Sequence, residues 1–368
     1  MYEFPTDYQS ILSRLNSIDP ALYASTRNYL SGATTKLSAY LTHGVITTQD
    51  VGNIALGKAS YAASQVLLKE LAWHDFYFAS WDQLGNTIFS DLRYPQTYNQ
   101  YPDLPAAVAT AATGISVIDQ SITELIDTGY MHNHSRLWLA MLCCNVAKTA
   151  WWNPSRWLYY HLLDGNIASN TLSWQWVAGS SRQLPYFANQ ENLNTYSGIS
   201  QRQTFLDYSY EDLAQNKVPP ILEERIELVL ETTLPTTSIP KLTGPVLLYH
   251  SWSLNPTWYQ TTTQPRVLLL EPSHFARFPM SEKRIAFILA LAKNIPNLTV
   301  VVANFEELST QNPDAVFCFR HHPAVTHWKG VREMVQPLFA VKYPITSSWS
   351  FSKFWSKSSI TIKLKDSK

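Results

Sequence analysis

Two short polar segments near the middle of the chain contain side chains that could hold a bound molecule. Residues 131–136 read Met-His-Asn-His-Ser-Arg, and residues 164–170 read Asp-Gly-Asn-Ile-Ala-Ser-Asn. Imidazole, amide, guanidinium and carboxylate groups together can both donate and accept hydrogen bonds. The His-Asn-His triplet could equally be a structural polar cluster. A metal site would need more ligands than these segments supply.

A hydroxyl-rich segment, Thr-Thr-Lys-Leu-Ser at residues 34–38, precedes an apolar stretch that is typical of a helix. Hydroxyl groups and backbone N–H groups at the start of a helix can form an anion site. Taken alone, the segment is better explained as an ordinary helix cap.

Aromatic residues are abundant, with 13 Trp and 20 Tyr in 368 residues. Most of them are explained by core packing. Glu70 and Trp73 lie three residues apart, so a helix would place them on one face. The Trp-Gln-Trp sequence at 174–176 follows the second polar segment closely. Stacking and electron transfer are therefore considered only for a few named tryptophans.

Together, in this order and spacing, these segments resemble the flavin-binding domain of the DNA photolyase/cryptochrome family. The resemblance covers about residues 20–200 and is strongest at 128–178. It implies a bound FAD, with a buried ion pair between Arg136 and Asp164 near the flavin ring. The FAD contacts that it implies are Thr34, Thr35, Leu37, Ser38, His74, Asn133, Arg136, Asp164, Asn166 and Asn170.

The resemblance also implies roles in catalysis. Asn170 would face flavin N5, where photolyases generally have Asn, and Trp174 and Trp151 would be the first two members of an electron relay. The residues that would hold the damaged pyrimidines are Glu70, Trp73, His134 and Trp176.

Several positions depart from the family pattern. His74 and His134 stand where the family has arginines that reach the cofactor and the substrate, and Asn166 replaces a second aspartate. Val108 replaces a tryptophan that is often the outermost relay member. An amide carbonyl at 166 can still accept a hydrogen bond, so we expect an altered site.

The periodicity of apolar residues predicts the elements that must position these side chains. Residues 1–215 are predicted to be mainly helical, in segments near 50–82, 105–128, 135–150 and 154–164. A Pro-rich connector is predicted at 216–244. Residues 245–345 are predicted to form a small α/β domain with a mostly parallel sheet. Its strands are expected at 246–249, 267–270, 298–302 and 316–319, with a helix at 281–294 between the second and third.

The predicted fold is thus a mainly α FAD-binding domain followed by a small α/β domain. That second domain is similar in pattern to the family's antenna domain, which usually comes first, and no pigment can be assigned to it. A Ser/Lys-rich tail is predicted at 346–368, and we expect the last twenty residues to fray.

We expect a FAD-dependent, blue-light-driven photolyase-like protein that repairs cyclobutane pyrimidine dimers by electron transfer from excited reduced flavin. The alternative is a cryptochrome-type flavin receptor for blue light that signals through a partner without repair. The expected partner of the enzyme is UV-damaged DNA. Residues 1–220 contain 12 Lys and Arg against 17 Asp and Glu. That acidic balance disfavours extensive phosphate contacts. Single-stranded DNA is the expected preference, because its bases are already unpaired and cost less to flip.

The chain's compartment is predicted from what its sequence lacks. It opens without a secretory signal, and its apolar run at 137–147 is too short for a membrane span. Three cysteines, at 143, 144 and 318, do not make a disulfide framework. We therefore expect a cytoplasmic protein with no membrane partner.

Overall fold

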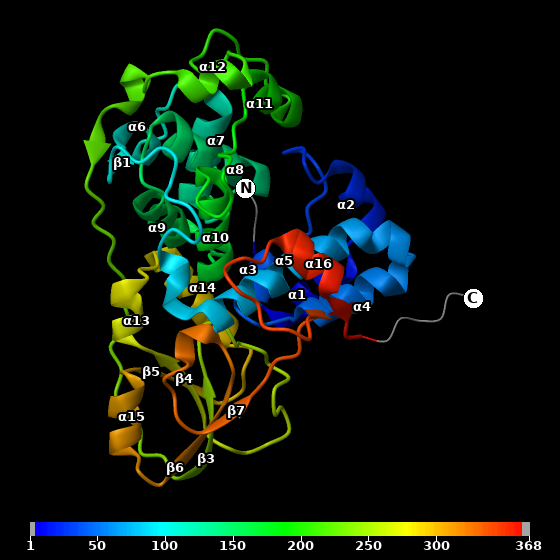
Figure 1. Ribbon diagram of the computed structural model, residues 1–368. Helices are drawn as coiled ribbons and strands as arrows, with labels where there is room; N and C mark the ends of the chain where they lie inside the picture. The colour runs from blue at the N-terminus through cyan, green and yellow to red at the C-terminus, as the bar shows by residue number, and fades with distance from the viewer. Residues whose placement is uncertain (1–3, 363–368) are drawn as a thin grey trace.

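The computed structural model describes residues 4–362, which form a helical part and a part built on a parallel sheet. In Figure 1 the helices of the first part occupy the upper half and the right of the molecule, and the sheet lies at the lower left with α15 beside it. One apolar core continues from the first helices into both faces of the sheet, and a second core lies within the helical part.

The helical part contains helices that begin and end at ordinary capping signals. The longest, α5 (Tyr61–Leu84), begins after Ser60, whose side chain accepts from the backbone N–H of Ala63, and α10 (Ile167–Ala178) ends at Gly179 in the left-handed conformation. The others are α1 (Tyr8–Asn16), α2 (Pro20–Thr26), α3 (Ser38–Thr42), α4 (Thr48–Lys58), α6 (Ala106–Ala109), α7 (Ser116–Thr128), α8 (Asn133–Met141), α9 (Trp152–His161), α11 (Gln190–Ser197) and α12 (Tyr210–Gln215).

The sheet has five parallel strands in the order β5-β4-β3-β6-β7. The strands are β3 (Gly244–Tyr249), β4 (Arg266–Leu270), β5 (Leu298–Val302), β6 (Ala315–Arg320) and β7 (Val331–Glu333). Helices α13 (Pro272–Arg277), α14 (Glu282–Ala292) and α15 (Phe305–Gln311) connect them. The order reverses between β3 and β6, because the chain adds strands outward from β3 on one side and then returns to add β6 on the other.

The predicted fold class is confirmed, with a mainly helical first part and a parallel sheet in the second. All four predicted strands and the helix at 281–294 coincide with observed elements. The structure adds β7, which is short and carries two exposed residues, so it lacks an apolar pattern. It also adds two antiparallel pairs, β1 (Leu104–Pro105) with β2 (Arg225–Ile226) and β8 (Phe339–Ala340) with β9 (Ser359–Ile360).

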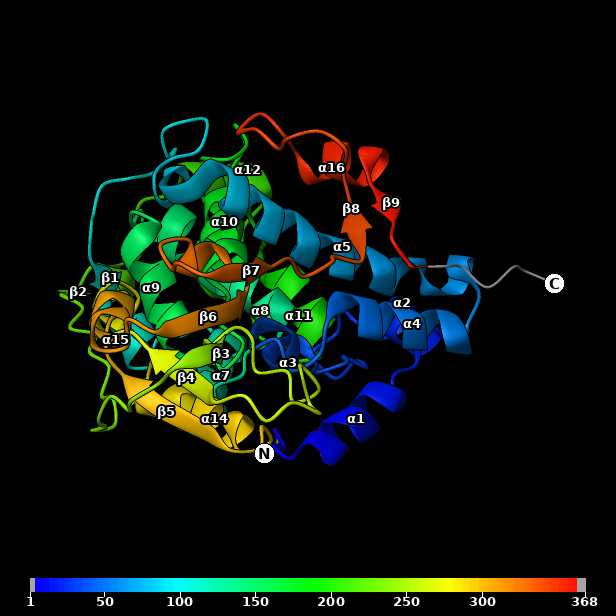
Figure 2. The same ribbon diagram turned by 90° about the horizontal axis from the view of Figure 1, so that it is seen from below.

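The expectation that the last twenty residues fray is wrong for the described part of that segment. Helix α16 (Phe351–Lys357) packs on α5, and its Phe351 and Phe354 are buried. Figure 2 shows α16 and the β8–β9 pair beside α5. Two buried phenylalanines outweigh the polar composition that suggested fraying. Residues 363–368 lie outside the described residues.

Arg284 of α14 joins the two parts of the molecule. Its side chain is fully buried. Its guanidinium donates to the backbone carbonyl of Tyr159, at 3.0 Å, and to that of Gly165, and it lies 4.4 Å from the centre of the Tyr159 ring. A second link is His43, whose Nδ1 and Nε2 contact the carbonyl oxygens of Ser251 and Leu163 at 2.6 and 2.9 Å.

We predict that Arg284→Met lowers the free energy of unfolding by about 3 kcal/mol, because two buried carbonyl groups lose their donor. Urea denaturation followed by circular dichroism measures the loss. Arg332→Met is the matched control, because Arg332 is exposed and its replacement should change stability by no more than about 0.5 kcal/mol. Equal effects of the two substitutions would contradict a structural role for Arg284.

Candidate functional site

A cavity of about 440 Å³ lies within the helical part. This volume falls in the range of cofactor pockets, roughly 300–1,000 Å³. Its walls come from α2, the 34–38 segment, α5, the start of α8, the turn before α10 and α10 itself. The predicted site residues that line it are Thr34, Thr35, Ser38, Glu70, Trp73, Asn133, His134, Arg136, Asp164 and Trp176.

An ion pair between Arg136 and Asp164 forms one wall of this cavity. Nη2 of Arg136 donates to both carboxylate oxygens of Asp164, at 3.0 and 2.9 Å, and its Nε donates to the Met131 carbonyl at 2.8 Å. The Asp164 side chain is only 6% exposed, so its charge depends on this partner. Thr42 donates to the Asp164 carbonyl at 3.1 Å and fixes the backbone there.

Gly165 allows the turn to pass close to Arg284. A Cβ atom at this position would lie 2.5 Å from Nη1 of Arg284 and 2.8 Å from the Tyr159 carbonyl oxygen. Asp164 and Gly165 are thus held between two guanidinium groups, Arg136 on the cavity side and Arg284 behind.

The opposite wall carries hydroxyl groups and two more cations. Lys36 has a φ of +51°, and its Nζ lies 5.7 Å from the centre of the Tyr130 ring. Partial burial lowers the pKa of Lys36 to about 8, so the ammonium form still predominates at neutral pH. Arg27 pairs with Glu70 at 2.8 Å, and burial raises the pKa of that carboxyl although Arg27 opposes the shift. The cavity is lined by three cations, Arg27, Lys36 and Arg136, and by two carboxylates, Glu70 and Asp164. This excess of positive charge favours an anionic ligand.

His132 is a neutral ring in the wall of the cavity. Its Nδ1 accepts from the backbone N–H of His134 at 3.1 Å. Burial lowers its pKa to about 4, although a backbone hydrogen bond with Arg27 opposes the shift. A neutral imidazole whose Nδ1 accepts must carry its proton on Nε2.

Aromatic residues form the end of the cavity nearest the C-terminal segment. Trp73, Tyr77 and Trp176 line this cavity and also a neighbouring one of about 260 Å³. Phe351 of α16 stacks on Trp73, with ring centres 3.7 Å apart and planes at 9°. The Arg182 guanidinium lies 3.8 Å from the Trp176 ring. One face of Trp73 is thus already covered.

Asn170 does not line this cavity. Its Nδ2 donates to the Ser155 carbonyl at 2.9 Å, and it borders a separate small hollow beside α9. The residues of α10 that line the cavity are Ser173 and Trp176. Trp174 is 2% exposed and lies in the second core.

Other residues that were predicted to contact FAD or to form the electron relay also lie outside the 440 Å³ cavity. Leu37 is buried in the first core, and His74 and Asn166 line a different cavity between the helices and the sheet. Asn166 caps α10, its Oδ1 accepting from the backbone N–H of Ser169 at 3.0 Å. Trp151 is buried, donates from Nε1 to Asp91 at 2.8 Å and lies 5.5 Å from the Trp152 ring.

The sequence reasoning missed Arg27, Lys36 and His132. Lys36 could have been found, because it stands inside the hydroxyl-rich segment. The pairing of Arg27 with Glu70 spans 43 positions of the chain and has no local signal. The role of His132 becomes apparent only in the structure, where its side chain caps α8.

Comparison with known proteins identifies related sequences. The family described as the FAD binding domain of DNA photolyase matches residues 67–209. Deoxyribodipyrimidine photo-lyase of Streptomyces griseus is 28% identical over 160 residues, which cover 43% of this chain and 35% of that protein. The mitochondrial photo-lyase of Saccharomyces cerevisiae is 30% identical over 174 residues, covering 42% and 30%. A protein named as a mitochondrial cryptochrome DASH in Neurospora crassa is 27% identical over 203 residues, covering 43% and 27%.

The matched region spans about a third of the length of these curated relatives. Among solved structures, Synechocystis sp. PCC6803 cryptochrome has a TM-score of 0.46 at 24% identity, covering 53% of this chain and 44% of that one. A class III photolyase from Agrobacterium tumefaciens has a TM-score of 0.47 at 23% identity, covering 52% and 43%.

The described residues contain neither a cluster of metal-binding side chains nor a membrane-spanning helix. Residues 4–362 contain no group of three or more His, Cys, Asp or Glu placed to hold a metal ion. Within the same residues, no helix has both the length and the apolar character needed to cross a membrane.

We predict that Gly165→Ala destabilises the fold by about 2 kcal/mol, because the added methyl group must displace a buried guanidinium or the turn itself. Thermal and urea unfolding measure the effect. Gly57→Ala in α4 is the matched control, because a Cβ there meets nothing within 4 Å and helical alanine should stabilise by about 0.5 kcal/mol or more. If Gly165→Ala leaves the free energy of unfolding unchanged, Arg284 does not constrain the turn.

Proposed function

Residues 67–209 belong to the FAD-binding domain family of DNA photolyases, and we propose that this protein binds FAD in the 440 Å³ cavity and repairs UV-damaged DNA in light. The observation that carries the proposal is the Arg136–Asp164 pair in a cavity whose other residues supply cations and hydroxyl groups.

These residues suit the two chemical ends of FAD. The hydroxyl groups of Thr34, Thr35 and Ser38 with the ammonium of Lys36 would hold the anionic diphosphate, since they are donors on one wall. The Arg136–Asp164 pair offers both donors and acceptors and would hold the polar edge of the flavin ring. Bound FAD would supply light-driven electron donation, which is chemistry that no side chain provides.

Trp73 and Trp176 would receive flipped bases at the aromatic end of the cavity. Unstacked bases are held by aromatic faces in many proteins that bind single-stranded or extruded nucleotides. Both residues line the cavity and its neighbour. Glu70 lies beside them and would accept hydrogen bonds from the bases, with its charge moderated by Arg27.

Trp151 is suited to carry positive charge in an electron relay. Its indole N–H donates to the Asp91 carboxylate at 2.8 Å, and a carboxylate stabilises the oxidised indole and can accept its proton. Trp152, with its ring centre 5.5 Å away, would be the next member in place of the tryptophan absent at Val108. We retain Trp174 as a relay candidate because it is buried in the same core as Trp151.

A cryptochrome-type light receptor is the second candidate function. Phe351 covers one face of Trp73, the ring that a lesion would stack on, and the first 220 residues carry a net charge of −5. Both features oppose DNA binding. The relatives include a named cryptochrome DASH as well as named photo-lyases.

We predict that the purified protein is yellow and that Arg136→Gln weakens FAD binding at least tenfold, because Asp164 loses its charged partner. A charge-assisted hydrogen bond contributes about 1.5–3 kcal/mol, which corresponds to this change. Equilibrium dialysis against FAD measures the affinity. Exposed Arg202→Gln in the same part of the chain is the control. A wild-type protein that takes up no FAD on reconstitution would refute the proposal.

We predict that Trp176→Ala weakens binding of dimer-containing single-stranded DNA by about 1–3 kcal/mol, the contribution of one base–aromatic stack. Exposed Tyr343→Ala should leave binding unchanged. Fluorescence anisotropy across a salt series measures affinity, and illuminated dimer cleavage measures repair. The acidic helical part should give a shallow salt dependence. FAD binding without any DNA binding would favour the light-receptor function.

A further inference from the structure

A second cavity, of about 100 Å³, lies between the sheet and the helical part. On the sheet side it is lined by Trp252 and Ser253, which follow β3, and by Arg320, His321 and His322 at the end of β6. The strand order reverses between β3 and β6. Open parallel sheets bind ligands outside the carboxyl ends of their strands at this point of reversal.

Four buried polar atoms around this cavity make no hydrogen bond within residues 4–362. They are Nε1 of Trp252, Oγ of Ser253, Nδ1 of His321 and Nε2 of His74. Ser253, His321 and Trp252 are 4%, 7% and 8% exposed. Native proteins leave few such groups unsatisfied, and each costs about 1–3 kcal/mol. All four belong to residues that line this one cavity, which indicates that a ligand supplies their partners.

Arg320 gives this cavity a positive charge. Its guanidinium forms no ion pair or hydrogen bond among the described residues. Two acids lie near it. Glu333 accepts from Trp258 at 2.9 Å and Tyr259 at 2.7 Å, and Asp50 accepts from the backbone N–H of Thr47 at 2.8 Å. The lining carboxyl, Asp75, accepts from Thr48 at 3.0 Å and from the backbone N–H of Phe339 at 2.8 Å.

The unsatisfied groups define what the ligand must present. Guanidinium and indole groups can only donate hydrogen bonds, and a hydroxyl group can also donate. Burial raises the pKa of Asp75 to about 7, so its negative charge is partly removed near neutrality. Nε2 of His321 contacts the Asp82 carboxylate and so carries the ring proton, which makes Nδ1 of the neutral ring an acceptor. The guanidinium, indole and hydroxyl donors therefore select acceptor oxygens and negative charge.

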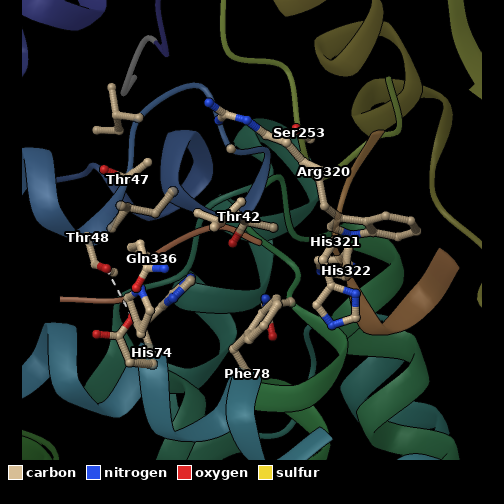
Figure 3. Close-up of a pocket in the computed structure, with 18 residues that line it drawn as sticks. Thr42, Thr47, Thr48, His74, Phe78, Ser253, Arg320, His321, His322 and Gln336 are labelled. Carbon is tan, nitrogen blue, oxygen red and sulfur yellow. Dashed lines mark hydrogen bonds between the residues drawn. The ribbon is translucent and has the colours of Figure 1, made fainter. Parts of the chain in front are cut away.

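The two sides of this cavity are fixed relative to each other. A Cβ at Gly44, whose φ is +61°, would lie 2.4 Å from the Trp252 carbonyl oxygen, and the backbone N–H of Leu254 donates to the His43 carbonyl at 2.9 Å. His321 reaches Asp82 of α5 at 2.6 Å. Figure 3 shows Thr42, His74 and Phe78 of the helical part around the same space as Ser253, Arg320 and His321.

We propose that this cavity binds a small oxyanion, a phosphate or a short carboxylate, through Arg320, Ser253, Trp252 and His74. Its volume is too small for a ring cofactor, since pockets for such molecules measure roughly 300–1,000 Å³. This oxyanion site is separate from the proposed FAD cavity, but the two share the turn that carries Asp164. Thr42 and Asn166 line the oxyanion site, and both lie next to Asp164.

Binding of inorganic phosphate and of acetate to the full-length, flavin-loaded protein tests the proposal. Isothermal titration calorimetry and phosphorus NMR line broadening measure affinity at constant ionic strength. Ser253→Ala should weaken binding about fivefold, the equivalent of one hydrogen bond, and should not perturb folding because Oγ has no partner among the described residues. Arg320→Gln should weaken it at least tenfold, the range of a charged hydrogen bond.

The controls are a buried serine and an exposed arginine away from the cavity. Ser64 donates to Ala55 within the helical part, and Arg332 is an exposed residue of β7. Ser64→Ala and Arg332→Gln should retain wild-type affinity. Saturable phosphate binding that depends on Arg320 supports a tetrahedral ligand, and acetate binding alone supports a carboxylate. Absence of saturable binding by either anion, or binding unchanged in both cavity variants, overturns the proposal.

Discussion

The buried guanidinium of Arg284 is the interaction on which the geometry of the 440 Å³ cavity, our proposed FAD site, depends. It donates to carbonyl groups at Tyr159 and Gly165, so it sets the position of the turn from behind. Arg136 then contacts Asp164 from the cavity side. The acid is therefore oriented by two arginines from different parts of the molecule. The sheet part thus contributes to the cavity without lining it.

Much of the fold could be predicted from the sequence, because strands and helices have local apolar periods. The four longer strands and α14 followed directly from that pattern, and the order of polar segments pointed to the flavin domain. The prediction failed for β7 and α16, whose sequences are polar or short. Their formation depends on partners distant in the chain, such as Trp73 for Phe351, and composition cannot supply that information.

The candidate site was predicted in part for the same reason. The resemblance to the flavin-binding domain pointed to Arg136, Asp164, Glu70, Trp73 and Trp176, all of which line one cavity. It could not determine which side chains of α10 line that cavity: Asn170 was expected beside the flavin, whereas Ser173 and Trp176 are the residues of α10 that line it. The cap of α8 and the positive φ of Lys36 likewise depend on three-dimensional packing.

The position of Arg284 in the chain has a consequence for biosynthesis. Every residue that lines the FAD cavity is translated before it, and Gly165 precedes it by 119 residues. At about 5–20 residues per second, a ribosome needs roughly 6–24 s to cover that interval. During this time the nascent helical part holds the complete set of cavity side chains, but the turn that carries Asp164 lacks its support. Cofactor capture would therefore be completed only when the sheet has emerged and docked.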